Sequence, residues 1–406
     1  MSKKIKEEKS LVWRTLSYYI WQLKKNLQYA IPLMILAPLA IVFNNYISAF
    51  LLAETINKLT TGVEVTWANY APWILGFVAV MTFGELFCWR LVVWLHWHME
   101  TRIVYGLNRA AFDALSEQSM QFHNNRFGGS LVSQTNKFSS GYVRVADTII
   151  FVLLPLIIGL IATFVILGPR LPMFTLFLGI FSAIFMIVAY FSYRRTLKLS
   201  EKEANLQTKL SGKLADSISN IVTVKSYGRE GFEKDRFAVA NRKVQVATSA
   251  LIKAVVVRDF GFGAVIVAIS ALVVTTIVFG QQWFGVALGT LILAMQYSQL
   301  LLGNLWSSNR ILRDFNRAFG DAKEMTEILD SQKAVFDKKG AKAIMVTKGK
   351  VDFNDITFRH ADSPKSEIVF ENFNLHVKPG QRVGLVGRSG SGKTTLTKLL
   401  LRFADV

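Results

Sequence analysis

Six apolar stretches, each long enough to cross a lipid bilayer as a helix, constrain the fold of this chain more than any other feature of its sequence. A membrane-spanning helix needs about 20 mainly apolar residues, and such stretches fold as helices because lipid cannot satisfy free backbone groups. The predicted spans cover about residues 28–53, 70–97, 147–167, 172–193, 260–280 and 283–304. Charged residues make up only 18% of the chain, which excludes two ordinary soluble domains. The sequence therefore predicts a membrane protein that is mainly α-helical.

The placement of positive charge predicts which side of the membrane each connection faces. The chain has a net charge of +19, and its Lys and Arg residues concentrate in the two long connections that follow the second and fourth spans. The short connections hold almost no positive charge beyond Lys58 and Arg170. Because cytoplasmic loops are enriched in Lys and Arg, we expect both long connections, the N-terminus and the C-terminal region to be cytoplasmic. The lipid bilayer is the expected partner, and no nucleic acid is needed to explain the charge.

The membrane domain has recognisable patterns at its start and end. Apolar residues recur at helical spacing in residues 11–25, which predicts a short helix on the membrane surface. No apolar core with a small-residue cleavage site is present there, so a secretory signal peptide is not expected. The long connections keep helical spacing, and we expect the spans to continue into the cytoplasm as stalks. The helical pattern ends near residue 330, so the transmembrane domain is predicted at 1–330.

The pattern changes after this point. Residues 331–350 are rich in Lys, Gly and Ala without helical periodicity, which predicts a linker. Alternating segments follow at Val351–Phe353, Ile356–Phe358 and Asn374–Val377, and then a turn at Lys378–Gly380. Alternation bounded by turn residues is typical of strands. Residues 351–406 are therefore predicted to be the N-terminal part of a soluble α/β domain.

A complete phosphate-binding motif lies in this last region. Residues Gly387, Arg388, Ser389, Gly390, Ser391, Gly392, Lys393 and Thr394 match G-x-x-x-x-G-K-[ST] at every fixed position. Val383–Val386 before the motif is predicted to be a buried strand, and Thr395–Leu401 after it a helix. In this context backbone N–H groups cradle a β-phosphate, Lys393 contacts the β- and γ-phosphates and the Thr394 hydroxyl ligates Mg²⁺. Thr395, the next residue of the helix, completes the predicted site.

The motif alone leaves an ATPase, a nucleotide kinase and a GTPase open, because all three use the same cradle. The architecture narrows the choice. Six spans with cytoplasmic stalks, followed by a phosphate loop, resemble the exporters of the ATP-binding-cassette (ABC) family. Phe122–Ser133 and Asp216–Glu230 are similar to the first and second intracellular loops of that family. Val351–Gly387 is similar to the first strands of its nucleotide-binding domain, so the resemblance covers nearly the whole chain.

The resemblance implies ATP-driven export by a dimer of such halves, with ATP and Mg²⁺ as cofactors. The partner is a second transporter half, identical or different, and the exported substrate is not implied. Short helices of the intracellular loops are expected to dock on the motor domains, which nominates Met120–Arg126 and Ser226–Glu230. His360 stands where an aromatic residue of the family stacks on adenine, and Phe358 should face the other side of its strand. The expected location is a bacterial plasma membrane, with the N-terminus and the nucleotide-binding domain cytoplasmic.

The sequence departs from the family after the phosphate loop. It stops at Val406, where the family continues with a glutamine loop, a signature motif, a second acidic strand and a histidine. We therefore expect a fragment of a longer protein, since this chain holds no complete catalytic set. Two alternatives stay open from the sequence: a membrane regulatory or binding subunit that binds ATP without hydrolysing it, and a membrane-anchored phosphate-loop enzyme of another class, such as a kinase.

Polar residues inside the second span are candidates for a substrate cavity. A charge near the bilayer centre costs about 2.5–3.5 kcal/mol, so Glu85 and Arg90 should face the bundle interior or a wet cavity. Their spacing of five residues does not suit an α-helical pair, and a structural contact with another helix is as reasonable as a substrate contact. His96 and His98 lie at the end of the same span. Two histidines alone are a poor metal site, so we predict an interfacial aromatic belt with Trp94.

Overall fold

Two compact units make up the chain. The computed structural model describes residues 2–124, 126, 128–331, 340–346, 348–359, 368–388 and 390–406. The first unit consists of Met1–Lys25, Thr101–Val143 and Ala318–Val406, and the second consists of Asn26–Glu100 and Arg144–Arg317. The second unit holds most of the apolar helices.

Five helices among the described residues are long and apolar enough to cross a membrane. Three of them contain a short π-helix. In chain order their parts are α2 (Leu27–Ile41), η1 (Val42–Ile47) and α3 (Ser48–Thr60); α4 (Trp67–Met81), η2 (Thr82–Trp89) and α5 (Arg90–Ser116); and α7 (Gly128–Thr148), η3 (Ile149–Leu153) and α8 (Leu154–Leu167). The other two, α9 (Pro172–Ser219) and α11 (Glu230–Phe284), are continuous. The chain is therefore a multi-pass membrane protein with the helical fold that its sequence predicts.

The sixth predicted span overlaps α12 (Leu288–Ser308), which is not among these five helices. It starts at Leu288 rather than near residue 283, because α11 ends only at Phe284. Protein contacts bury much of α12. The Tyr297 hydroxyl donates to the Tyr46 carbonyl at 2.7 Å, and the two rings meet edge to face at 5.1 Å. This bond joins α12 to η1 inside the core of the second unit, and its position in a membrane stays a prediction.

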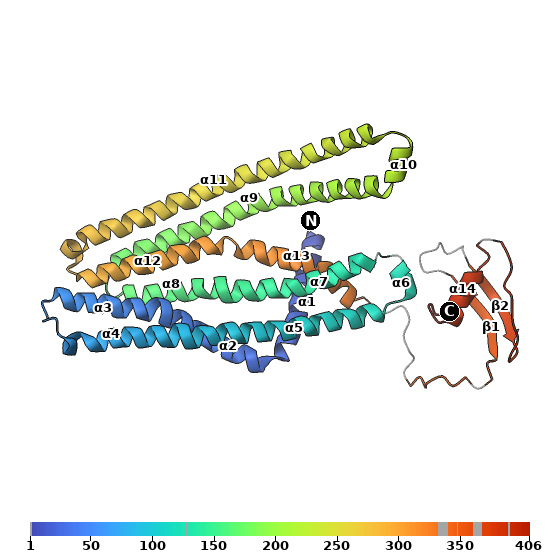
Figure 1. Ribbon diagram of the computed structural model, residues 1–406, viewed down its shortest axis with the longest axis horizontal. Coiled ribbons are helices and arrows are strands. Elements are labelled where there is room, and N and C mark those ends of the chain that lie inside the picture. The colour runs from blue at the N-terminus through green and yellow to red at the C-terminus, as the bar shows by residue number, and fades with distance from the viewer. Residues whose placement is uncertain are drawn as a thin grey trace. The chain divides into compact units, whose positions relative to one another are not determined.

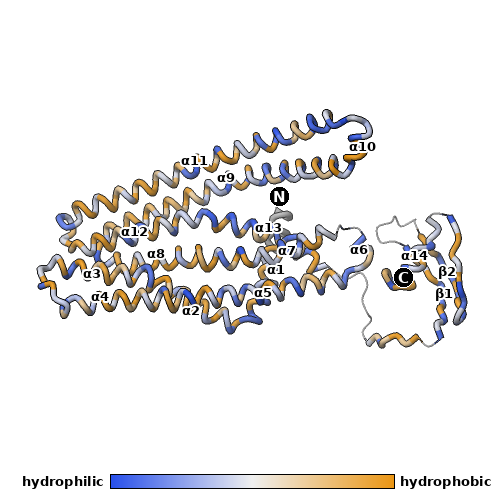
Figure 2. Tube along the Cα trace, in the orientation of Figure 1, coloured by the Kyte–Doolittle hydropathy of each residue, from blue (hydrophilic) through white to orange (hydrophobic). Residues whose placement is uncertain are grey.

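The two longest helices, α9 and α11, run side by side and are joined through the short helix α10 (Ile221–Ser226), as Figure 1 shows. The rings of Phe185 and Phe262 stack between them at 4.5 Å. Figure 2 shows mainly apolar residues in the parts of α9 and α11 far from α10 and mainly hydrophilic residues near α10. This gradient agrees with helices that leave the membrane and continue as stalks.

In the first unit, α1 (Ser2–Lys24) packs by one face against α7 and α13 (Ile311–Leu329). The Tyr19 hydroxyl donates to the Phe138 carbonyl at 2.7 Å, and the hydroxyls of Thr15 and Thr326 are 2.8 Å apart. The helix predicted at 11–25 is thus confirmed and begins earlier. Its predicted place on the membrane surface stays a prediction, and Trp13, on another face, is exposed.

Two antiparallel strands and one helix form the described part of the C-terminal region. β1 (Val351–Phe358) pairs with β2 (Phe370–Val377), with Val351 opposite Val377 and Phe358 opposite Phe370. The turn that follows β2 is closed by a bond from the Gln381 N–H to the Lys378 carbonyl, 3.1 Å long. α14 (Lys393–Leu400) comes last. The strands, the turn and the helix are those that the sequence predicts.

One predicted strand is wrong. Val383–Val386 has no strand structure, and Val386 is 94% exposed. A strand requires a neighbour that pairs with its backbone N–H and C=O groups. Within the described ranges, only β1 and β2 form such a ladder. The segment therefore has the apolar composition of a central strand, but it is not a strand because no described segment pairs with it.

Candidate functional site

The phosphate loop leads directly into α14. Gly390 and Gly392 have φ values of 84° and 86°, a backbone conformation that other residues rarely adopt. A Cβ atom at Gly392 would also lie 2.8 Å from Cζ of Phe370 in β2. The glycine at this position therefore allows both the turn and the close approach of the loop to the strand. The loop's N–H groups then stand at the N-terminus of α14, where the helix dipole favours an anion.

The ammonium group of Lys393 bonds to oxygen atoms of its own loop. Its Nζ atom donates to the carbonyl oxygens of Gly387 at 2.8 Å and Arg388 at 2.7 Å, and lies 3.3 Å from the Ser391 hydroxyl. The ammonium group is thus folded over its own loop, with oxygens of the loop as its partners. Phosphate oxygens are stronger partners for an ammonium because they carry charge. The loop, the helix N-terminus and this lysine fit the polyphosphate of a nucleotide.

The remaining predicted site residues divide into two groups. Thr394 is exposed at the start of α14 and Thr395 is partly buried beside it. Their suggested roles toward Mg²⁺ and nucleotide stay predictions. Ser389 and His360 lie outside the described residues. Phe358, the aromatic residue nearest to His360, is only 7% exposed, and so its ring does not offer a free face for a base.

Short helices occupy both predicted intracellular loops. α6 (Met120–Asn124) lies within the nominated segment Met120–Arg126. In the second loop the nominated segment Ser226–Glu230 runs from the last residue of the short helix α10 through a turn to the first residue of α11. Val222 of α10 is 75% exposed. An open pocket of about 460 Å³ lies beside it, lined by Asn220, Thr223, Val224, Tyr227, Arg229, Phe232 and Glu233.

Glu85 and Arg90, the candidate cavity residues, form a pair. The Arg90 guanidinium lies 3.4 Å from Glu85, and the Asn44 amide of η1 donates to the other Glu85 oxygen at 3.0 Å. The expectation that five residues is a poor spacing is wrong because Glu85 lies in η2, and a π-helix bonds each residue to the one five positions along. A side chain at Gly84 would overlap the Asn44 amide, so glycine permits this approach of η1 and η2.

The two histidines of the second span have different surroundings. His98 packs against Trp94 at 4.3 Å between ring centroids, with the rings tilted by 34°, and the aromatic belt at a membrane interface stays a prediction. His96 does not belong to such a belt: it is fully buried, and its Nε2 atom lies 2.8 Å from a carboxylate oxygen of Asp147. Asp147 and Glu100 are not among the site residues that the sequence predicts. The spacing of His96 and Glu100, one helical turn apart, was the available signal.

Comparisons with known proteins match both the membrane helices and the phosphate-loop region to families of one class of transporter. The chain matches the family described as "ABC transporter transmembrane region" over residues 31–305 and the family "ABC transporter" over residues 370–405. A solved structure of a bacterial Atm1-family ABC exporter with ATP bound has a TM-score of 0.72 and 21% identity, with 93% of this chain and 66% of that chain covered. At this identity, the likeness shows the shared fold.

Curated proteins with similar sequences are also ABC transporters. The YwjA protein of Bacillus subtilis, an uncharacterized ABC transporter ATP-binding protein, is 22% identical over 349 residues, which cover 84% of this chain and 58% of that protein. An ATM1-type heavy metal exporter of Novosphingobium aromaticivorans is 26% identical over 300 residues, with 72% of this chain and 48% of that protein covered. The chain spans between 33% and 58% of the length of the curated relatives compared.

Proposed function

Since the chain belongs to the ABC transporters, through the transmembrane region matched over residues 31–305, we propose that it is one half of a dimeric exporter that moves a substrate across the membrane at the expense of ATP. The observation that carries this proposal is the phosphate loop, with Lys393 poised over Gly387 and Arg388 at the start of α14. The apolar helices supply the pathway, and the loop supplies the nucleotide site.

The nucleotide site consists of residues in and beside this loop. We assign it to Gly387, Arg388, Ser389, Gly390, Ser391, Gly392, Lys393, Thr394 and Thr395, with His360 as the residue proposed to face adenine. The N–H groups at the start of α14 hold the phosphates, and the Thr394 hydroxyl is the proposed ligand of Mg²⁺. ATP bound with Mg²⁺ supplies the free energy for transport. When ATP binds, the Lys393 ammonium group would leave the carbonyl oxygens of Gly387 and Arg388 and donate to phosphate oxygens instead.

The short helices α6 and α10 are the proposed contacts with the motor domains of the two halves. The tip of α10 supports this role because Val222 and Tyr227 are exposed, at 75% and 77%. Exposed apolar groups in such a place are typical of a surface that a partner covers. The second half, identical to this chain or different, is the proposed partner. We place the protein in the plasma membrane with its N-terminus, α10 and the phosphate loop cytoplasmic.

Glu85 and Arg90 are the proposed polar residues of the substrate path. Their side chains are 44% and 66% exposed, and a charged group on a membrane helix faces water or another protein rather than lipid. A path between two halves meets this requirement. Substrate-stimulated transport by the Glu85→Gln and Arg90→Met proteins tests the assignment, and unchanged transport by both would contradict it.

Binding of ATP in the native membrane tests the central step. We expect a photoreactive ATP analogue, added with Mg²⁺, to label the protein and excess ATP to prevent the labelling. Lys393→Ala removes the ammonium group from the loop and should abolish most of the labelling. Lys398→Ala is the matched control, since Lys398 lies on the same helix and the ammonium group that bonds to the loop carbonyls is that of Lys393.

The outcomes separate clearly. Loss of labelling in Lys393→Ala with normal labelling of Lys398→Ala supports the proposed site. Equal labelling of both variants and the parent protein would show that the analogue binds elsewhere and would contradict the proposal.

A further inference from the structure

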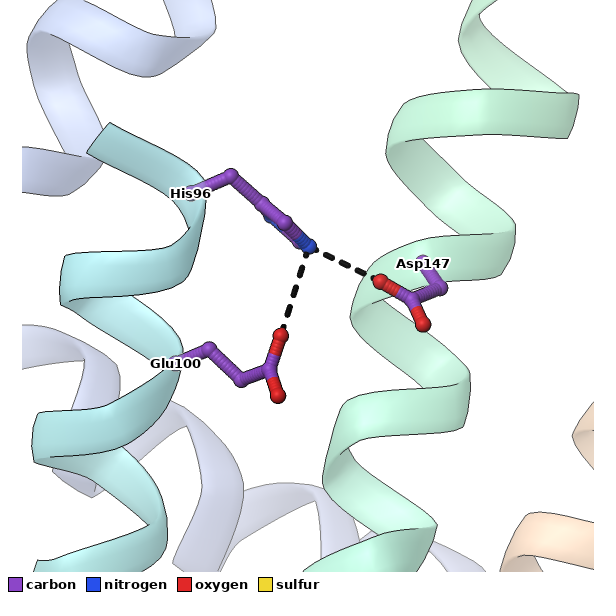
Figure 3. Close-up of side chains that lie close together, drawn as sticks. All are labelled: His96, Glu100 and Asp147. Atoms are coloured by element: carbon purple, nitrogen blue, oxygen red, sulfur yellow. Dashed lines mark hydrogen bonds and ion pairs between the residues drawn. The ribbon is translucent and has the colours of Figure 1, made fainter. Parts of the chain in front are cut away.

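We infer that His96, Glu100 and Asp147 form a binding site for a divalent transition-metal ion between α5 and α7. Figure 3 shows the three side chains pointing toward one another, His96 and Glu100 from one helix and Asp147 from the facing helix. This inference does not depend on the exporter function, and it concerns residues outside the phosphate loop.

The geometry suits a shared ion. The His96 Nε2 atom lies 2.8 Å from Asp147 Oδ1 and 3.6 Å from Glu100 Oε2, and one ligand atom of each residue lies within 4.8 Å of the other two. With metal–ligand bonds of about 2.0–2.2 Å, ligand atoms around one ion stand roughly 3–3.5 Å apart. The three atoms therefore need only small side-chain movements to surround an ion.

The two carboxylates of the cluster also favour a bound cation. Two carboxylates face one imidazole nitrogen, the Nε2 atom of His96. A neutral imidazole has a single N–H, so it can donate to only one of them through that atom. Carboxylates whose oxygens lie within 4.8 Å of each other repel when both are ionised. A divalent cation at the centre would balance both carboxylates and accept the Nε2 lone pair, with the single imidazole proton then carried by Nδ1.

The burial is uneven in a way that suits binding. His96 is fully buried, whereas the side chains of Glu100 and Asp147 are 23% and 48% exposed. The imidazole is thus held inside the bundle while the carboxylate side stays open, so an ion can enter and keep water among its ligands. The Nδ1 atom of His96 is buried and makes no hydrogen bond with any described residue, which leaves Nε2 as the atom that meets polar partners.

Neighbouring residues fix the direction of the ring. Phe151, one turn after Asp147, stands edge to face against the His96 ring at 5.1 Å between centroids. Trp89, at the end of η2, packs against the same phenylalanine at 6.0 Å. Each helix therefore offers two residues four positions apart, His96 with Glu100 and Asp147 with Phe151. An ion at this point would tie α5 to α7.

The donor set indicates the kind of ion. One imidazole nitrogen with two carboxylate oxygens suits Zn²⁺, Mn²⁺, Fe²⁺ or Co²⁺, whereas Mg²⁺ and Ca²⁺ prefer oxygen ligands alone. Zn²⁺ is the most convenient probe, because it has no redox chemistry and its binding can be measured against a coloured chelator.

The test uses the tag-free protein in lipid nanodiscs, stripped of metal with a chelator and titrated with Zn²⁺. We expect one tight Zn²⁺ per chain, and no competition from Mg²⁺ at equal concentration. Asp147→Asn keeps the shape and a hydrogen bond to His96 but removes a charged ligand, and should weaken Zn²⁺ binding at least about tenfold. Glu100→Gln, at the open side, should weaken it as well.

His98→Gln is the matched control, because His98 is the neighbouring histidine, packs against the Trp94 ring and is not one of the three cluster residues. It should leave the affinity unchanged. The alternative for this cluster is a protonated imidazole held between two carboxylates. That alternative predicts no stoichiometric Zn²⁺ binding, and this result would overturn the proposal. Tight binding that survives both Asp147→Asn and Glu100→Gln would overturn it too.

Discussion

Two groups of polar side chains lie in apolar helices of the second unit, and they balance their charges differently. Glu85, Arg90 and Asn44 form an open group in which a carboxylate faces a guanidinium and an amide. The other group is the metal-site cluster of His96, Glu100 and Asp147, in which two carboxylates face one buried imidazole. The first group is neutral by itself. The second has two carboxylates and one imidazole, and so it is the group that a divalent cation would balance.

The largest expected effect is stabilisation of the folded protein by Zn²⁺, which should depend on the metal-site cluster and not on the open group. If the cluster binds Zn²⁺, a free concentration a hundred times Kd should stabilise the folded protein by about 2.7 kcal/mol. The Asp147→Asn protein should lose this stabilisation, whereas the Arg90→Met protein should keep it. Thermal unfolding in nanodiscs, with and without Zn²⁺, measures both. Equal Zn²⁺ stabilisation of the two variants would remove the distinction between the groups.

The next effect tests whether Arg90 balances the charge of Glu85 within the open group. Arg90→Met leaves Glu85 without its cation in a membrane helix, which should destabilise the protein by up to about 2.5 kcal/mol. Adding Glu85→Gln removes the unpaired charge and should restore most of that loss. Melting temperatures of the single and double variants give the comparison. A double variant that is less stable than Arg90→Met would show that the two side chains act independently.

A smaller effect concerns the contact between η1 and η2. Asn44→Ala deletes the donor to Glu85, whose carboxylate keeps Arg90 as a partner. We expect a loss of about 0.5–1.5 kcal/mol, the usual net value of one hydrogen bond. Asn45→Ala, the neighbouring position on η1, is the control for loss of an asparagine from this turn. Thermal unfolding checks the difference between the two variants, and equal losses would argue against the specific bond.

The smallest effect involves a carboxylate outside the membrane helices. Asp352 in β1 meets Lys350 at 2.6 Å and His376 of β2 at 2.9 Å, and these hydrogen bonds lower the pKa of its carboxyl group below the usual 3.8. The folded state therefore gains stability that is present above pH 3.8 and is lost as the pH falls through the lowered pKa. Hydrogen exchange of β1 and β2 amides should show faster opening in that acid range. Asp352→Asn should remove this dependence on pH, and an unchanged profile would contradict the pairing.

The phosphate loop could be predicted because its chemistry is local. Eight consecutive residues carry the glycines, the lysine and the threonine, and the cradle needs no partner from elsewhere except the close packing of Phe370 on Gly392. The helical membrane fold followed from composition in the same way. Residues 383–386 failed as a strand since a strand depends on pairing with another segment, which composition does not contain.

The polar groups of the membrane helices were harder to predict. The Glu85–Arg90 pair depends on a π-helix, whose wider turn changes which residues face each other, and the sequence gives no clear sign of it. The metal-site cluster joins residues of two helices that are distant in the chain. Its α5 half was visible as a spacing of four residues, but Asp147 comes beside His96 only through helix packing.

The most direct test of the account is whether ATP moves the intracellular loops. The only cysteine, Cys88, is buried and can be replaced by alanine. Spin labels can then be attached at Met120→Cys on α6 and Val222→Cys on α10, both exposed positions. Pulsed electron resonance measures the distances between the labels in the protein in liposomes. The account predicts that Mg²⁺ and ATP shift this distance distribution and that Lys393→Ala abolishes the shift. Identical distributions with and without ATP in the parent protein would contradict it.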